Sequence, residues 1–130
     1  MDRTIEESFV NSYIISNKRE RLLFELQGKK RQEGVGRFCH CADNLLMQST
    51  IKAHGKDITQ ELQKQITISK CSKCYVISFF EELDGKIFDK EEVLDAILGL
   101  GMPSIVIFDD FVIIETEQVQ GTAIKYLLKK

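Results

Sequence analysis

The stretch SIVIFDDFVIIET, from Ser104 to Thr116, decides the fold that the sequence predicts. Two runs of β-branched and aromatic residues, 105–108 and 111–114, flank the polar pair Asp109-Asp110, and this pattern is typical of two strands joined by a turn. Both runs are almost continuously apolar instead of alternating, as in strands that are covered on both faces. The stretch therefore predicts a β-hairpin at the centre of the hydrophobic core.

The residues on either side of the hairpin predict the rest of a sheet. Residues 74–80, CYVISFF, have the composition of another strand, and a capping box at Asp89 and Glu92 starts a helix before the hairpin. A strand, a helix and a strand in this order predict a right-handed βαβ unit. Residues 122–128 fit either a further strand or a short terminal helix, and we favour the strand.

The first half of the chain has the hydrophobic periodicity of helices. A capping pattern at Thr4 and Glu7 begins the first helix, and further helices are predicted over 18–28 and 29–48. Two glycines in the last of these segments each cost a helix about 1 kcal/mol relative to alanine. We nevertheless expect a helix there, because apolar residues recur on one face.

Together these elements predict a single domain over residues 1–130, of the α+β or α/β class. Within the first half, residues 49–57 are polar, which predicts a turn or a short exposed crossing before a further helix that carries Ile58, Leu62 and Ile66. We expect 1–66 to be mostly helical and 74–128 to form a βαβββ unit. The helices would then pack on a small mixed sheet of about four strands, which ends in a C-terminal hairpin.

Bulk composition limits the classes of protein to which the chain can belong. With 130 residues, of which 43% are hydrophobic and 29% charged, the chain is large enough to bury one core and too apolar to be disordered. A formal net charge of −2 gives no overall attraction to nucleic acid or to an anionic membrane. The N-terminus carries acids where a signal peptide carries bases, and no apolar run approaches the roughly 20 residues of a membrane span. We therefore expect a cytoplasmic protein with no membrane partner.

Four cysteines, Cys39, Cys41, Cys71 and Cys74, give the most specific chemical hypothesis. In a reducing compartment such residues are thiols or metal ligands before they are disulfides. The C-x-x-C spacing of Cys71 and Cys74 lets two sulfurs bind one tetrahedral zinc ion, and Cys39 and Cys41, or a histidine, would supply the other ligands. Against this, C-x-C side chains on a helix point about 200° apart, and cysteine is often just a small buried apolar residue. We favour a protein without a cofactor and keep a structural zinc site as the alternative.

Acidic residues form the second candidate site, at Asp84, Asp109, Asp110 and Glu117. In a βαβ unit, Asp84 and the Asp109-Asp110 pair would follow the carboxyl ends of two parallel strands, which is the edge where α/β proteins bind ligands. Carboxylates gathered there could bind a hard cation or perform acid–base chemistry. Turns between apolar strands are also polar for purely structural reasons, and no phosphate-binding loop accompanies these acids. We therefore expect an acidic surface first and an enzyme site second.

A basic segment in the first half of the chain raises the question of nucleic-acid binding. Lysines and arginines gather at 18–21 and 29–31, as a phosphate-binding face requires. However, Glu20, Glu25 and Glu33 are interleaved with them at the spacing of helical ion pairs. No RNP, KH or helix-turn-helix signature accompanies it. The segment therefore predicts a solvated helix face, and we do not expect a nucleic-acid partner.

Several segments together resemble a known family. These are KRERLLFEL at 18–26, KKRQEGVGRF at 29–38, CYVISFFEELDGK at 74–86, SIVIF at 104–108 and IIETEQVQGTAIKYLLK at 113–129. In these segments the chain is similar to a family of small, uncharacterised proteins of Gram-positive bacteria, some of which are encoded near polymorphic toxin gene clusters. The resemblance implies a partner-binding or immunity-type role, and it implies no catalytic residue.

The sequence thus favours a non-catalytic intracellular module that binds another protein, of the immunity or antitoxin type. The first alternative is a structural zinc-binding domain that uses the four cysteines. The second is an enzyme with an acidic site at the carboxyl edge of the sheet. Assembly into a homo-oligomer is compatible with all three.

Overall fold

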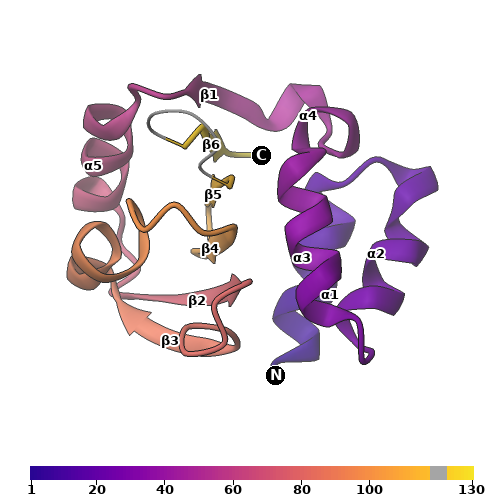
Figure 1. The fold of residues 1–130 in the computed structure, drawn as a ribbon. Coiled ribbons are helices and arrows are strands. Elements are labelled where there is room, and N and C mark those ends of the chain that lie inside the picture. The colour runs from indigo at the N-terminus through magenta and orange to yellow at the C-terminus, as the bar shows by residue number, and fades with distance from the viewer. Residues whose placement is uncertain (118–122) are drawn as a thin grey trace.

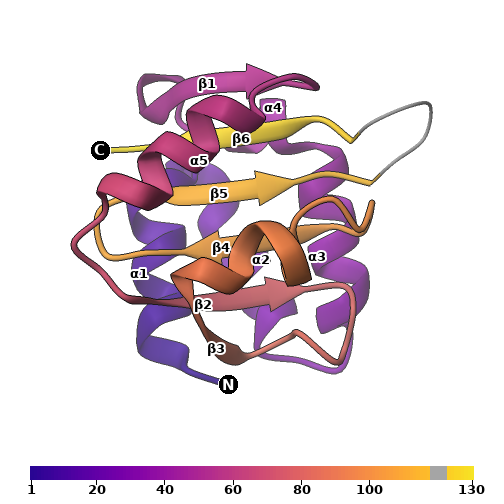
Figure 2. The same ribbon diagram turned by 90° about the vertical axis from the view of Figure 1, so that its left-hand side faces the viewer.

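The computed structural model describes residues 1–117 and 123–130, and in these residues a six-stranded sheet lies between two layers of helices (Figure 1, Figure 2). Across the sheet the strands follow the order β1 (Ile51–Gly55), β6 (Lys125–Leu128), β5 (Val112–Glu115), β4 (Ser104–Ile107), β2 (Lys73–Ser78) and β3 (Lys86–Asp89). Every neighbouring pair is antiparallel. The predicted α+β class is confirmed, but the described sheet has six strands where the sequence predicted about four.

The predicted βαβ unit, and with it the mixed sheet, is wrong. Strands β2 and β4 are neighbours but run antiparallel, with Ser78 opposite Ser104. Between them the chain first forms β3, which pairs with β2 as a hairpin, and then the short helical turns η3 (Lys90–Glu92) and η4 (Val93–Ile97). The extra strand reverses the chain once more, so that β4 enters the sheet antiparallel to β2. The capping box that starts the helical segment, at Asp89 and Glu92, is confirmed.

The N-terminal helices cover one face of the sheet, and α5 (Thr59–Ile68), η3 and η4 cover the other (Figure 1, Figure 2). The first layer comprises α1 (Arg3–Tyr13), η1 (Ser16–Lys18), α2 (Arg19–Leu26), α3 (Arg31–His40), α4 (Ala42–Leu45) and η2 (Gln48–Thr50). The helix predicted over 29–48 is therefore divided between α3 and α4. The cap predicted at Thr4 and Glu7 is wrong, because Asp2 caps α1 and accepts a hydrogen bond from the Ile5 N–H at 3.1 Å.

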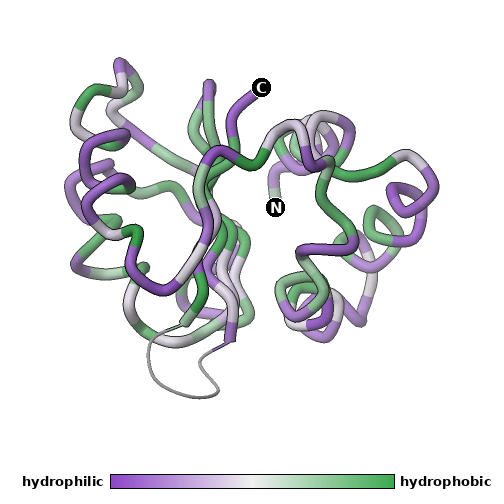
Figure 3. Tube along the Cα trace, turned by 90° about the horizontal axis from the view of Figure 1, so that it is seen from above, coloured by the Kyte–Doolittle hydropathy of each residue, from purple (hydrophilic) through white to green (hydrophobic). Residues whose placement is uncertain are grey.

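Side chains that alternate along the strands form two hydrophobic cores. In β2, Tyr75 and Ile77 face the N-terminal helices, whereas Cys74 and Val76 face α5 and η4. Hydrophilic residues gather on the outer turns of the helices in both layers (Figure 3). Because both faces of the sheet are covered, the inner strands are buried and mostly apolar, and the hairpin of β4 and β5 lies among them as predicted.

The edges of the sheet are β1 and β3, both of which the sequence prediction missed. Strand β1 exposes alternate side chains and β3 exposes most of its side chains. Neither therefore has the continuous apolar run that is typical of a buried strand. Strand β6 confirms the strand predicted near the C-terminus, although Thr122, the first residue of that prediction, lies outside the described residues. None of the helices in the described part of the chain combines the length and apolarity needed to cross a membrane.

Candidate functional site

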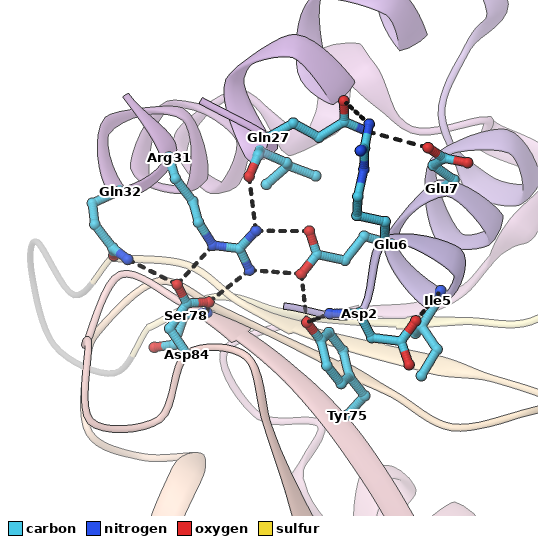
Figure 4. Close-up of polar contacts among 12 residues, drawn as sticks. Asp2, Ile5, Glu6, Glu7, Gln27, Arg31, Gln32, Tyr75, Ser78 and Asp84 are labelled. Atoms are coloured by element: carbon cyan, nitrogen blue, oxygen red, sulfur yellow. Dashed lines mark hydrogen bonds and ion pairs between the residues drawn. The ribbon is translucent and has the colours of Figure 1, made fainter. Parts of the chain in front are cut away.

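Arg31, the first residue of α3, is buried between the helix layer and the sheet, where carboxylates from two other elements surround it (Figure 4). Its Nη1 and Nη2 donate to the two carboxylate oxygens of Glu6, each at 2.7 Å. Its Nε and Nη2 donate to the carboxylate of Asp84 at 2.7 and 2.9 Å. Nη1 also donates to the carbonyl oxygen of Leu26 at 2.9 Å. All five N–H donors of the guanidinium are therefore used inside the protein.

The same cluster satisfies the hydrogen-bonding capacity of its carboxylates. The Tyr75 hydroxyl donates to Glu6 at 2.6 Å and accepts a hydrogen bond from the Asp2 N–H at 2.9 Å. Burial, followed by the hydrogen bond to Glu6, raises the pKa of Tyr75 to about 12. Burial alone would lower the pKa of Arg31, but its hydrogen bonds to Asp84 and Glu6 outweigh burial and raise it. The cluster is thus a saturated network of fixed charges and offers no free donor or base to a substrate.

Asp84 also fixes the loop that follows β2. Its carboxylate accepts hydrogen bonds from the Ser78 N–H at 3.1 Å and from the Gln32 side chain at 2.8 Å. Its own N–H donates to the Phe80 carbonyl at 3.2 Å, and the next N–H, of Gly85, donates to the Val76 carbonyl at 2.7 Å. The loop 79–85 is therefore held at both ends by hydrogen bonds and by the buried arginine.

The prediction that Asp84 belongs to an acidic surface is wrong. Only 6% of Asp84 is exposed, and its carboxylate is paired with Arg31. Asp109 and Asp110 are exposed in the β4–β5 turn, whereas Glu117 is exposed beyond β5. Because the strands are antiparallel, that turn and Glu117 lie at opposite ends of the sheet. The acids proposed for an enzyme site are consequently divided between the interior and two separate surfaces.

The four cysteines are also separated. Cys39 on α3 lies in the core under the N-terminal helices, and Cys74 on β2 lies in the core on the other face of the sheet. Burial raises the pKa of Cys74 to about 12 and raises that of Cys39 as well. Cys41 and Cys71 are half-buried. A zinc site made of all four would require two thiols to leave separate cores, and the described residues contain no cluster of three metal-ligating side chains.

A second buried polar group escaped the sequence analysis. The paired residues Ser78, Ser104, Glu115 and Lys125 form a row across β2, β4, β5 and β6, on the face that carries α5 and η4. The two serine hydroxyls are 2.8 Å apart, and Glu115 Oε1 lies 3.6 Å from Lys125 Nζ and accepts a hydrogen bond from the Gly99 N–H at 2.7 Å. Glu115 Oε2 has no hydrogen-bond partner among the described residues. Burial raises the pKa of Glu115.

Exposed apolar and acidic side chains gather at the end of the sheet beyond this row. Backbone hydrogen bonds continue the strand pairing beyond the row: Phe79 N–H donates to the Pro103 carbonyl at 2.9 Å, and Thr116 N–H donates to the Ile124 carbonyl at 2.9 Å. These segments meet at the end toward which β2 and β5 point in Figure 2. We call this region the loop-end surface; its exposed residues are Phe79, Phe80, Glu81, Glu82, Leu100, Glu117 and Ile124.

A scan against protein-family models, a search of curated proteins and a search of solved structures find no match to this chain. The chemistry of the chain itself must therefore indicate the function. The buried charged side chains form ion pairs with one another. The accessible side chains at the loop-end surface are suited to binding.

Proposed function

We propose that the protein is a non-catalytic interaction module of the immunity or antitoxin type, and that it binds a protein partner through the loop-end surface. One observation carries this proposal. Phe79 and Phe80 are 40% and 36% exposed, next to Glu81 and Glu82, in a loop that the buried Arg31–Asp84 pair holds in place. Single exposed apolar side chains are ordinary, as at Phe24, whereas neighbouring ones that form a patch mark interaction sites.

The anchoring of the loop supports a binding role. A partner that binds a flexible loop must compensate for the conformational entropy lost on binding, whereas a loop held by hydrogen bonds has already lost it. Aromatic side chains are enriched among the residues that dominate binding energy at interfaces. The loop-end surface combines two phenylalanines with a fixed backbone, which is the arrangement expected of a pre-organised binding site.

The charge of this surface indicates the chemistry of the partner. Its charged residues, Glu81, Glu82 and Glu117, are all acidic. Acidic side chains repel the phosphates of nucleic acid and favour association with a basic protein surface. We therefore expect a partner protein that presents lysine or arginine residues around an apolar contact. A toxin that acts on nucleic acid would carry such a surface, in agreement with the family resemblance noted from the sequence.

The proposal is tested by affinity capture from the native host with matched surface variants. The two variants E81K/E82K and F80S alter the loop-end surface. Their controls, D109K/D110K and F24S, make the same kinds of change at exposed residues elsewhere, at the other end of the sheet and on α2. All six substituted positions are exposed, so folding should be retained.

We expect wild type and both controls to capture the same protein, and both loop-end variants to lose it. Loss of a central aromatic contact typically costs about 2 kcal/mol, or roughly a thirtyfold loss of affinity. Where a neighbouring gene encodes a toxin, co-expression should protect cells with the wild type and fail with F80S. Equal capture by all variants, or the absence of any reproducible partner, would contradict the proposal.

A further inference from the structure

A pocket in the N-terminal helix layer has a composition different from that of the loop-end surface. It has a volume of about 260 Å³ and lies between α2 and the segment formed by α3 and α4, helices that are neighbours in Figure 1. Its apolar wall comprises Leu22, Phe38 and Leu45. Two of these side chains, Leu22 and Phe38, belong to the hydrophobic core, where close packing holds them in place.

Cations surround this apolar wall. Lys18, Arg21 and Arg37 line the pocket, together with one acid, Glu25. Arg37 forms an ion pair with Glu25, which neutralises that carboxylate. Within the described part of the chain, the side chains of Lys18 and Arg21 form no ion pair with any residue, and both residues are exposed. Two uncompensated positive charges therefore stand beside a concave apolar surface.

We propose that this pocket binds a small amphipathic anion, a carboxylate joined to a compact apolar group. The apolar part would contact Leu22, Phe38 and Leu45, and the carboxylate would accept hydrogen bonds from Lys18 and Arg21. Ligand sites commonly consist of an apolar wall with a few polar groups that fix orientation. The volume limits the ligand to a small molecule with a single ring or a short chain. This site is separate from the loop-end surface and does not depend on the proposed function.

The half-buried thiol of Cys41 lies in the lining of the pocket and reports on its occupancy. Cys71 is also half-buried but lies outside the pocket, so it serves as an internal reference in the same molecule. The experiment measures the rates at which iodoacetamide alkylates both cysteines, by peptide mass spectrometry. The probe is phenylacetate, and its neutral analogue phenylacetamide has the same shape without the charge.

We expect phenylacetate to slow the alkylation of Cys41 in a saturable manner and to leave Cys71 unchanged. Removing both cations in K18Q/R21Q should raise the phenylacetate concentration needed for protection by up to about fivefold for each cation, because an ion pair at an exposed site contributes at most about 1 kcal/mol. The control variant K29Q/K30Q removes two exposed lysines that do not line the pocket and should have no effect.

Equal protection by phenylacetamide would show that charge is not recognised and would overturn the proposal. Absence of protection, or protection that survives unchanged in K18Q/R21Q, would overturn it as well. A parallel slowing of Cys71 would mean that phenylacetate stabilises the whole protein or acts on the reagent, and it would also contradict specific occupancy of this pocket.

Discussion

The two buried charge clusters of this protein differ in how completely their charges are compensated. Arg31 lies between Glu6 and Asp84, and all its donors are paired at 2.7 to 2.9 Å. Glu115 and Lys125 are 3.6 Å apart at their closest charged atoms, and Glu115 Oε2 has no hydrogen-bond partner within the described residues. The charged groups of the first cluster are fully paired, and only the neutral amide oxygen of Gln32 beside Asp84 lacks a partner among the described residues. In the second cluster a carboxylate oxygen itself lacks one.

The clusters also differ in what they connect. Arg31 joins α3 to α1 and to the loop after β2, so it links the helix layer to the sheet. Glu115 and Lys125 are paired neighbours on adjacent strands, which backbone hydrogen bonds already hold together. A saturated cluster is therefore found where only side chains fix the relative position of two layers. A looser pair is tolerated where the backbone has fixed the geometry.

Replacing Arg31 by methionine should have the largest effect on stability. The change leaves the carboxylates of Glu6 and Asp84 buried without their cation, and breaking a buried ion pair typically costs about 3 to 5 kcal/mol. Urea unfolding monitored by circular dichroism would measure the free energy of unfolding. Arg31→Lys keeps the charge but has three donors for the five hydrogen bonds, so its stability should lie between that of the wild type and that of Arg31→Met. A methionine variant as stable as the wild type would show that the cluster does not hold the layers together.

The looser pair should respond differently to single and double substitution. Lys125→Met alone leaves Glu115 buried beside an apolar side chain and should cost about 2 kcal/mol, within the range for an unsatisfied buried group. The double variant E115Q/K125M removes both charges and should recover most of this loss, because replacing a buried ion pair by uncharged groups is often neutral. The same urea experiment measures both variants. A double variant less stable than Lys125→Met would contradict this expectation, because it would show that Glu115 stabilises the fold even without Lys125.

Local sequence predicts the buried strands of this protein and misses its edge strands. The hairpin at 104–116 and the strand at 74–80 were predictable because strands buried on both faces are continuously apolar. Strands β1 and β3 were missed because edge strands expose many of their side chains. Missing β3 also changed the predicted direction of β4, since each added strand reverses the chain.

The Arg31 cluster had no local signal at all. Asp84 lies 53 residues beyond Arg31 in the sequence, and Tyr75 lies 69 residues beyond Glu6, so only the packing of layers brings them together. Glu115 did have a signal. It ends the apolar run of β5, and a symmetrical hairpin around Asp109-Asp110 places it opposite Ser104. An acid that continues a buried strand should be expected to be buried with a partner.

Close packing beside Arg31 provides a smaller test of how the helix layer is positioned. A β-carbon added at Gly34 would lie 2.8 Å from the β-carbon of Glu25 on α2, whereas one added at Gly36 would meet only the ring of Phe79 at 3.5 Å. Gly34→Ala should therefore destabilise the protein by about 1 to 2 kcal/mol, since overpacking exceeds the gain in helix propensity.

Gly36→Ala in the same helix is the matched control for this substitution. It gains helix propensity without a clash and should be neutral or more stable by up to about 1 kcal/mol. Both stabilities are obtained from urea unfolding. Equal effects of the two substitutions would mean that α2 and α3 can separate without loss, and that the Arg31 cluster alone sets their position.

The smallest expected effect is a pH dependence at acidic pH that Glu115 of the second cluster should produce. Burial raises the pKa of Glu115, and the Gly99 amide, Lys125 and the Gly101 amide offset this only in part. At pH values between the ordinary glutamate pKa and this raised pKa, the folded state binds more protons than the unfolded state. The stability that Glu115 contributes is therefore present at low pH and is lost as the pH rises through this window. The stability of the wild type relative to Glu115→Gln should therefore decrease as the pH increases from about 4.3, the ordinary pKa of glutamate.

Urea unfolding of both proteins at a series of pH values measures this difference, and Glu82→Gln, at an exposed position, controls for the substitution itself. A relative stability that stays constant or increases across the window would show that Glu115 is ionised in the folded protein as readily as in the unfolded chain, and that its missing hydrogen bond carries no electrostatic cost.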